Sequence, residues 1–192
     1  MYEKINERYK IKGREIAMIK IFDELETKRI GRGAGIPREE GEALYSFIKE
    51  HNIKRVIETG ICWGFSSYYI LSALPKDGEL ISIETLAKKQ EDTVVPPELW
   101  PRWHIIPYSS EISLFLAFQT NKNIDLFFHD SDHCYKNQMF EWETAFPFVD
   151  FIGSHDTTLK GPPFAWKDFT EKRNIHVLVT LGQLGIGARI WP

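Results

Sequence analysis

Two short runs of histidine and aspartate follow apolar segments, and their side chains can move protons or bind a metal. The first run is residues 129–133, His-Asp-Ser-Asp-His, and the second contains His155 and Asp156. His133 is a candidate general base, because an imidazole titrates near neutral pH. Asp130, His155 and Asp156 would suit a divalent ion, Mg²⁺, Mn²⁺ or Fe²⁺, with open positions for a substrate oxygen. A structural role stays open for His133, which could instead cap or pack against the next helix.

A glycine-rich segment, residues 58–67, offers a second kind of chemistry, the binding of a small anion. Gly60 and Gly64 allow a tight turn, and a helix beginning near Gly64 would point free N–H groups at an anion. Ser66 can add a hydroxyl there, and Glu58 carries the negative charge that suits an ammonium group. The segment lacks the Gly-x-Gly-x-x-Gly pattern of pyrophosphate-binding loops. We therefore expect it to hold the carboxylate and ammonium groups of an amino acid.

Polar residues at the ends of the next two strand-like segments predict a nucleoside beside that amino acid. Glu84 lies roughly 20 residues beyond the glycine-rich turn, where an acid can hydrogen-bond two ribose hydroxyls. Ser109 and Ser110 follow the third strand-like segment, where small hydroxyl side chains can face the edge of an adenine. An amino acid, a ribose and an adenine in this order are the parts of S-adenosylmethionine.

These residues need a scaffold that brings the ends of several strands together. Short apolar runs alternate with helical stretches along the chain, which predicts a doubly wound, mostly parallel sheet of the α/β class with an antiparallel edge strand. In such a sheet ligands bind beyond the carboxyl ends of the strands, where the residues above lie. The seven expected strands are residues 55–58, 79–84, 103–107, 124–128, 151–153, 176–180 and 187–191.

The segment 58–67, with Glu84 and the run 128–133, resembles the class I S-adenosylmethionine-dependent methyltransferases, and most of all their small O-methyltransferase-like branch. The shared pattern is Glu-x-Gly-x-x-x-Gly-x-Ser, followed by a strand that ends in Asp-x-Asp-His. The resemblance covers residues 36–192 and implies a Rossmann-like methyltransferase fold, with residues 1–35 as a helical extension, either a lid or a dimer contact. The cofactor-binding residues that it implies are Glu58, Gly60, Gly64, Phe65, Ser66, Glu84, Ser109, Ser110 and Asp130.

The resemblance also implies an activity, the transfer of a methyl group from S-adenosylmethionine to a small-molecule acceptor, foremost a hydroxyl oxygen. Asp130 and His133 are its expected catalytic residues. Metal-dependent members carry ligands at the strand ends that bear Asp130, His155 and Asp156 here. Three alternatives stay open: a hydroxylase-like relative with iron at these residues, a nicotinamide-dependent oxidoreductase, and a catalytically silent nucleoside-binding module. The missing Gly-x-Gly-x-x-Gly pattern counts against the nicotinamide enzyme.

Composition restricts the setting of this chemistry. The 192 residues are 43% hydrophobic and 27% charged, the balance of one soluble globular domain. A net charge of −3 argues against a dedicated nucleic-acid binder, which normally carries a basic field. No apolar run reaches membrane-helix length, the N-terminus is not a signal peptide, and Cys62 and Cys134 read as reduced thiols. We expect a cytoplasmic protein without membrane or nucleic-acid partners, and a homo-oligomer stays open.

Aromatic residues make up 14% of the chain and divide into core and site candidates. Trp142 lies on the apolar face of a helical stretch and is expected in the core. His129 is also expected to be buried, because alternation along a strand points it away from Asp130. Trp63 and Trp166 lie nearer the expected mouth of the site, where an indole could stack on a flat acceptor.

Overall fold

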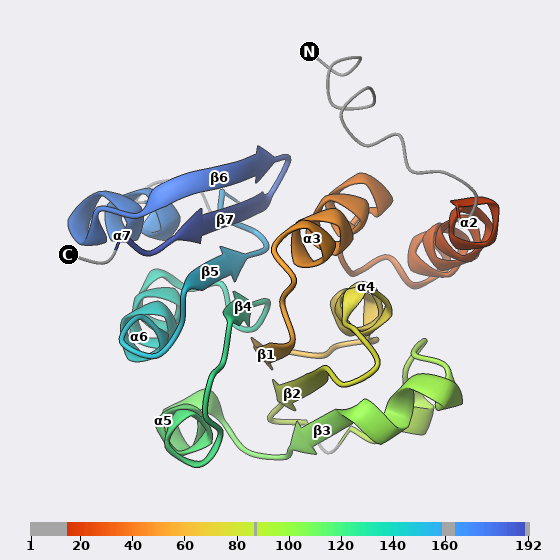
Figure 1. The fold of residues 1–192 in the computed structure, drawn as a ribbon, viewed down its shortest axis with the longest axis horizontal. Coiled ribbons are helices and arrows are strands. Elements are labelled where there is room, and N and C mark those ends of the chain that lie inside the picture. The colour runs from red at the N-terminus through yellow and green to blue at the C-terminus, as the bar shows by residue number, and fades with distance from the viewer. Residues whose placement is uncertain (1–14, 87, 159–163, 191–192) are drawn as a thin grey trace.

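The computed structural model describes residues 15–86, 88–158 and 164–190 and arranges them around one sheet (Figure 1). No helix in these ranges is both long and apolar enough to cross a membrane. The strands are β1 (Arg55–Thr59), β2 (Glu79–Ile83), β3 (Trp103–Ile106), β4 (Leu126–His129), β5 (Phe151–Ser154), β6 (His176–Leu181) and β7 (Leu184–Ala188). The helices are α2 (Glu15–Arg32), α3 (Arg38–Glu50), α4 (Phe65–Ala73), α5 (Ser110–Thr120), α6 (Tyr135–Ala145) and α7 (Ala165–Arg173), with 3₁₀ turns η1 (Gln90–Asp92) and η2 (Pro97–Arg102).

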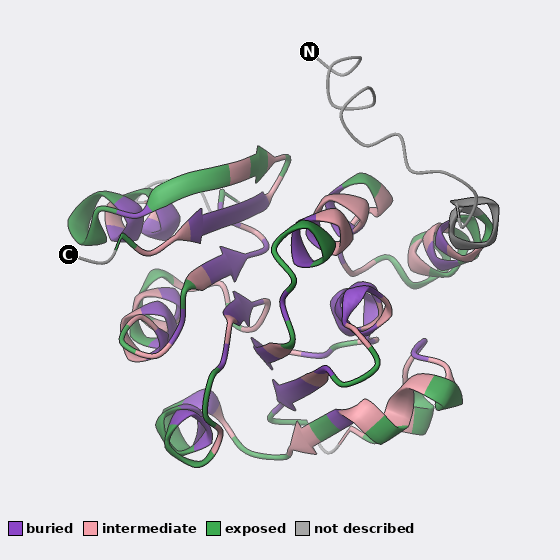
Figure 2. Ribbon diagram, in the orientation of Figure 1, coloured by how far each residue is buried: buried purple, intermediate pink, exposed green. Residues whose placement is uncertain are grey.

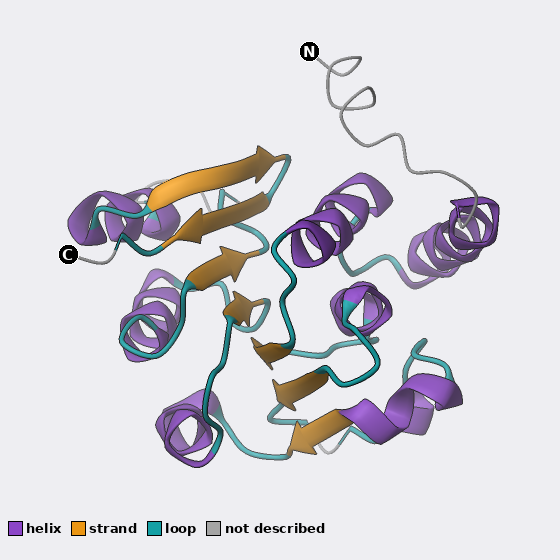
Figure 3. Ribbon diagram, in the orientation of Figure 1, coloured by secondary structure: helices purple, strands orange, loops and turns teal. Residues whose placement is uncertain are grey.

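The sheet has the strand order β3-β2-β1-β4-β5-β7-β6, which confirms the expected doubly wound, mostly parallel arrangement (Figure 3). β1 pairs in parallel with β2 on one side and with β4 on the other. The chain therefore changes direction across the sheet between β1 and β4, and ligands of open α/β sheets bind at such a switch point. β7 is antiparallel to both β5 and β6, so the antiparallel strand lies one place in from the edge that β6 forms.

The last strand begins earlier than the sequence pattern predicted. β7 starts at Leu184 instead of residue 187, within a stretch whose glycines are typical of a loop. These glycines serve packing inside the sheet. A Cβ on Gly185 would lie 2.7 Å from the ring of Trp166, and one on Gly187 would lie 2.2 Å from Ile175. Glycine in a strand interior often marks such a close approach.

Helices cover both faces of the sheet, so side chains of β1, β2, β4 and β5 are mostly buried whichever way they point, whereas the edge strand β6 is largely exposed (Figure 2). α3 and α4 lie on one face together with α2, and α5, α6 and α7 lie on the other (Figure 1). Alternation along each strand divides the core into two clusters. Val56 and Phe128 belong to the first, and Ile57 and Phe127 to the second. Burial on both faces explains why β4 is an almost unbroken apolar run.

Some of the aromatic and histidine side chains lie where the sequence predicted, and others do not. Trp142 and His129 are fully buried, as expected. Trp166 was wrongly expected near the mouth of the site: it is only 8% exposed, and its ring centroid lies 5.4 Å from that of Trp142. The first turn of α7 points this indole into the second core cluster. Trp63 is half-buried, with the guanidinium of Arg32 and the ammonium of Lys88 over its ring at 4.2 and 4.4 Å.

α2 is attached to the sheet domain by apolar and polar contacts. Phe22 and Leu25 are buried in the first core cluster, and burial of each contributes about 1.5–3 kcal/mol. The first backbone N–H of α3 donates to a carboxylate oxygen of Glu26 at 3.1 Å. The helical part of the predicted extension 1–35 thus shares a core with the rest of the chain. Its role as a lid or dimer contact stays a prediction, and residues 1–14 lie outside the described residues.

Candidate cofactor and catalytic site

The loop after β1 lies at the switch point and touches the loop after β4. Gly60 has a φ of +83°, and a Cβ here would lie 2.2 Å from the carbonyl oxygen of Asp130. Its N–H donates to the carbonyl of Ile83 at the end of β2 (2.9 Å). The positive φ and the close approach of two backbones both require glycine. The contact brings the predicted cofactor loop beside the predicted catalytic loop.

The predicted anion site lies at the start of α4 and stays a prediction. Gly64 precedes the helix with a φ of +79°, and the N–H groups of the first turn have no acceptors within the helix. Ser66 lies in that turn and is buried, and its hydroxyl lowers the pKa of Glu58. Phe65 is buried against Gly35, where an added Cβ would lie 2.5 Å from its ring. Phe65 therefore also packs the cofactor loop against the connection between α2 and α3.

Glu84 holds the glycine-rich segment from the end of the neighbouring strand. Its Oε2 accepts the backbone N–H groups of Ile61 (3.0 Å) and Cys62 (3.3 Å), and its Oε1 accepts that of Leu86 (3.0 Å). Burial raises the pKa of this carboxyl, but the backbone donors outweigh burial and lower the pKa below its ordinary value. Glu84 is therefore an anion at neutral pH beside the loop. Its hydrogen bonds to a ribose stay a prediction.

Glu58 lies fully buried at the end of β1, under the same loop. The hydroxyls of Ser67 and Ser82 each donate to its Oε2 at 2.7 Å, while its Oε1 has no hydrogen-bond partner within the described part of the chain. Burial raises the pKa of Glu58 to about 7, against the lowering effect of the serine hydroxyls. A buried carboxylate with one uncommitted oxygen is a suitable acceptor for an ammonium group.

The two serines predicted to face an adenine lie at the start of α5. Ser109 precedes the helix, is half-buried and makes no side-chain cap. Its carbonyl oxygen accepts the hydroxyl of Ser113 at 2.8 Å. Ser110 is buried and lowers the pKa of Glu141 on α6. The adenine contact of both serines stays a prediction.

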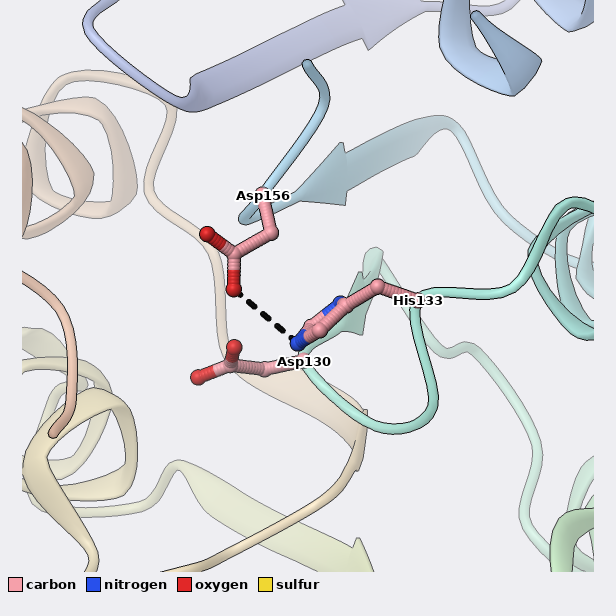
Figure 4. A group of neighbouring side chains, drawn as sticks. All are labelled: Asp130, His133 and Asp156. Atoms are coloured by element: carbon pink, nitrogen blue, oxygen red, sulfur yellow. Dashed lines mark ion pairs between the residues drawn. The ribbon is translucent and has the colours of Figure 1, made fainter. Parts of the chain in front are cut away.

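Asp130, His133 and Asp156 converge at the carboxyl ends of β4 and β5 (Figure 4). One ligand-type atom of each lies within 4.8 Å of the others, and Nε2 of His133 lies 2.9 Å from Oδ2 of Asp156. Burial would raise the pKa of Asp156, but the contacts with His133 and His155 hold it well below the usual range. Asp156 has a φ of +55°, which is uncommon for a residue with a side chain.

His155 connects this cluster to α3. Its Nδ1 lies 3.3 Å from Oδ1 of Asp130 and 3.2 Å from Oδ2 of Asp156. Its Nε2 lies 2.9 Å from Oε2 of Glu40, a charge contact without the alignment of a hydrogen bond. Burial opposes a charge on the ring, but the three carboxylates outweigh burial and raise the pKa of His155 to about 12. The ring is therefore an imidazolium at neutral pH.

Glu40 is a member of the cluster that the sequence pattern missed. An acid in the first turn of a helix usually complements the helix dipole at the surface. Its neighbour Glu39 is exposed, whereas Glu40 is only 6% exposed. Its Oε1 accepts the backbone N–H of Gln183 at 3.0 Å, and a Cβ on Gly182 would lie 2.2 Å from this oxygen. Helical spacing could have indicated that Glu40 is buried, because Glu40 lies one helical turn before Leu44, which is buried.

A buried network under the catalytic loop holds residues 129–133 in place. Oε2 of Glu141 on α6 lies 2.6 Å from Nδ1 of His129 and accepts the hydroxyl of Thr59 at 2.5 Å. Oε1 of Glu141 accepts the hydroxyl of Ser131 at 2.9 Å. Burial raises the pKa of Glu141, but the contact with His129 and the hydroxyl donors outweigh it and lower the pKa. One buried carboxylate thus joins β1, β4 and the catalytic loop.

The residues predicted to bind a metal lie close together, and a further histidine joins them. Asp130, His155 and Asp156 do lie side by side, as the strand ends suggested. The group with one ligand atom available from each member contains His133 with the two aspartates. Two carboxylates and one neutral imidazole fit a divalent cation, so His133 is a second candidate for the imidazole ligand. A metal held by Asp130, His155 and Asp156 stays a prediction.

Residues 57–154 match the profile of a family described as "Methyltransferase domain". The match extends over half of the chain and includes the loops after β1, β2 and β4. The chain therefore belongs to the methyltransferase domain family.

Individual relatives agree with this assignment. A caffeoyl-CoA O-methyltransferase of Populus kitakamiensis is 35% identical over 72 residues, which are 36% of this chain. The matched part spans only 31% of that relative's length. A methyltransferase from Geobacter sulfurreducens has a TM-score of 0.70 at 14% identity, over 99% of this chain and 96% of its own. The O-methyltransferase of Bacillus cereus, solved with S-adenosylhomocysteine, has a TM-score of 0.65 at 12% identity, over 97% of this chain and 96% of its own. At these identities the structures establish the shared fold.

Proposed function

We propose that the chain transfers the methyl group of S-adenosylmethionine to a hydroxyl oxygen of a small-molecule acceptor. Family membership and one structural observation support the proposal: the backbone of Asp130 in the catalytic loop touches Gly60 in the cofactor loop. A methyl donor beside Gly60 would therefore lie next to the polar cluster at the strand ends. The relatives from poplar and Bacillus cereus are O-methyltransferases, which favours oxygen as the acceptor atom.

The cofactor would lie along the loop after β1. The first turn of α4 points N–H groups at its carboxylate. Glu58 offers its uncommitted Oε1 to the ammonium group, and Glu84 meets the ribose hydroxyls beyond β2. A bound ammonium group would lower the pKa of Glu58 again, because a nearby positive charge favours the carboxylate. Ser109, half-buried at the start of α5, would contact the adenine farther along the same edge.

His133 would act as the base for an acceptor hydroxyl. Its Nε2 faces Asp156, and its Nδ1 has no hydrogen-bond partner in the described ranges. Nδ1 is buried, so the ring must move to expose it to the acceptor. The hydroxyl proton then moves to Nδ1 while the oxygen attacks the methyl carbon in line with the sulfonium. An O–C bond forms, the C–S bond breaks, and the sulfur keeps the electron pair as S-adenosylhomocysteine leaves. Asp156 orients the ring and stabilises the imidazolium that forms.

A divalent cation fits the same cluster. Asp130, Asp156 and the neutral ring of His133 would hold it. When bound, it supplies positive charge that stabilises the anion of the acceptor oxygen. His133 would then be a ligand and the hydroxyl would need less help from a base. A chelator distinguishes the two mechanisms: it abolishes activity if the cation is required, and it has no effect if His133 acts as the base without a metal.

We also propose that the chain acts in the cytoplasm on an acceptor other than nucleic acid. Cys62 and Cys134 are both unpaired, which fits a reducing compartment. The net charge of −3 gives no general attraction for a polyanion.

Transfer of a labelled methyl group tests the proposed function. Purified protein, S-adenosylmethionine with a labelled methyl, and a panel of phenols, catechols and aliphatic alcohols are incubated with Mg²⁺ or with EDTA. Asp130→Asn should reduce transfer at least about 100-fold. Asp132→Asn is the matched control, because Asp132 is exposed and its Oδ1, which accepts the N–H of Cys134, is kept in asparagine. Transfer that is equal in the two variants would contradict the assigned role of Asp130.

A further inference from the structure

α5 is apolar on the face that it buries and also on the face that it exposes. Leu114 and Phe118 pack into the second core cluster. On the other side Ile112, Phe115 and Leu116 are 72%, 59% and 60% exposed. Figure 2 shows this exposed side of α5 turned away from the sheet. A helix that is apolar all round is normally covered on every side, and nothing in the described ranges covers the outer face of α5.

The exposed side chains form one continuous stripe. Positions 112, 115, 116 and 119 follow the i, i+3, i+4, i+7 spacing of one helix face, and we name these four residues the α5 stripe. The ring of Phe115 also meets the ring of Phe148 edge-on at 6.1 Å, which extends the apolar surface beyond the helix. Contiguous exposed apolar surface of this kind marks an interaction site.

We propose that the α5 stripe binds a second copy of this chain, with the two helices antiparallel across a two-fold axis. An axis between Phe115 and Leu116 places each Phe115 against Leu116 of the partner subunit. It places Ile112 against Gln119 of the partner subunit. Each residue of the stripe then meets the same surface on the other chain, as in the isologous interfaces of most homodimers.

The charges at the two ends of the stripe complement this pairing. Glu111 precedes the stripe and Lys122 follows it; both are exposed, and neither forms an ion pair within the described part of the chain. In the antiparallel pair Glu111 lies opposite Thr120 of the partner subunit, the last residue of α5, and Lys122 of the partner subunit follows two residues later. Opposite charges therefore meet at both ends. A parallel pair would bring like charges together, which is destabilising.

The outer face of α5 is uncovered within the described part of the chain, and α2 lies on the opposite face of the sheet (Figure 1). The pairing is also independent of the proposed methyl transfer, so it can be tested without an assay of activity.

Sedimentation equilibrium of the full chain at micromolar concentration tests the pairing. The wild-type protein is expected at twice the 22.4 kDa of one chain. Replacing Ile112 and Leu116 together by glutamate should raise the dissociation constant at least about tenfold, because carboxylates would be buried in the contact. Ile30→Glu is the matched control: Ile30 is 67% exposed on α2 and should leave the dimer intact. Circular dichroism verifies that each variant is folded, since none of these side chains is buried.

Charge reversal tests the antiparallel register. Glu111→Lys and Lys122→Glu should each weaken the dimer, and the two changes together should restore it. A monomeric wild-type chain would overturn the proposal, whatever else covers the stripe. A dimer that survives the double glutamate variant, or that Ile30→Glu dissociates, would place the contact elsewhere. If each single variant dimerises more weakly and the double variant does not regain the wild-type affinity, the proposed register is wrong.

Discussion

Nε2 of His155 lies 2.9 Å from Oε2 of Glu40, which joins the strand ends of the candidate site to the first turn of α3. The other oxygen of Glu40 accepts the backbone N–H of Gln183 in the turn between β6 and β7. His155 in turn contacts Asp130 and Asp156. The arrangement of the two aspartates therefore depends on a carboxylate that lies outside the strand-end motifs.

Glu40→Gln should impair the reaction more than it impairs cofactor binding. The variant removes a negative charge from beside the His155 imidazolium but keeps an oxygen for the N–H of Gln183. Altered positions of Asp130 should lower kcat by up to about 100-fold. Affinity for S-adenosylhomocysteine, measured by calorimetry, should stay within about twofold. Glu39→Gln, an exposed neighbour, is the control. Equal kcat in the two variants would mean that Glu40 has no positioning role.

The free energy of unfolding should fall as the pH rises from 4.5 to 7, because of Glu58. Its pKa is 4.5 in its ordinary state and about 7 in the fold. Between these values the folded state keeps a proton that the unfolded state has released, so rising pH favours unfolding, by about 3 kcal/mol over the window. Urea unfolding at several pH values measures the effect. Glu58→Gln cannot ionise at this position, so its free energy of unfolding should fall less steeply with pH than that of the wild type. The same pH dependence in both proteins would contradict the raised pKa.

Glu141→Ala should destabilise the fold strongly. It would leave His129 buried without its partner and would free Ser131 in the catalytic loop, at a cost of about 3–5 kcal/mol. Glu143 lies on the same helix but forms a surface ion pair with Lys172, at 2.7 Å. Glu143→Ala should cost about 0–1 kcal/mol. Denaturant titration compares the two, and similar losses would show that the buried network does not stabilise the loop.

Gly60→Ala should damage the site through its backbone. The methyl group would need the space of the Asp130 carbonyl oxygen, 2.2 Å away, at a positive φ. We expect a loss of about 1–3 kcal/mol in stability and weaker binding of S-adenosylhomocysteine. A Cβ added to Gly31, in the last turn of α2, would meet no atom of another element within 4 Å, so Gly31→Ala should be stabilising by up to about 1 kcal/mol. Unchanged stability and binding in Gly60→Ala would contradict the close contact of the two loops.

The sheet was predictable because its strands are short, apolar and regularly separated by helices. The buried strand β4 and the polar residues just after it were recognisable from residue type alone. The start of β7 was predicted too late because Gly185 and Gly187 are typical of a loop. In the fold these glycines leave space for the side chains of Trp166 and Ile175. Contacts of that kind depend on tertiary packing and leave no local signal.

The site was predictable where it depends on strand ends and not where it depends on helix faces. Asp130, His133 and Asp156 come together because parallel strands β4 and β5 end at the same edge. Glu40 and Glu141 were missed because acids on helices are usually solvent-exposed. Only the packing of α3 and α6 on the sheet shows that these two carboxylates face buried histidines.

Calorimetric titration with S-adenosylhomocysteine tests the central claim, that the loop after β1 and the end of β2 form a cofactor site. We expect one binding site per chain in the wild-type protein. Glu84→Gln keeps the shape of the side chain but removes its charge, and it should weaken binding at least about tenfold, since hydrogen bonds to a charged group are the stronger ones. No measurable heat at saturating ligand in the wild type, or equal affinity in the variant, would contradict the proposed cofactor site.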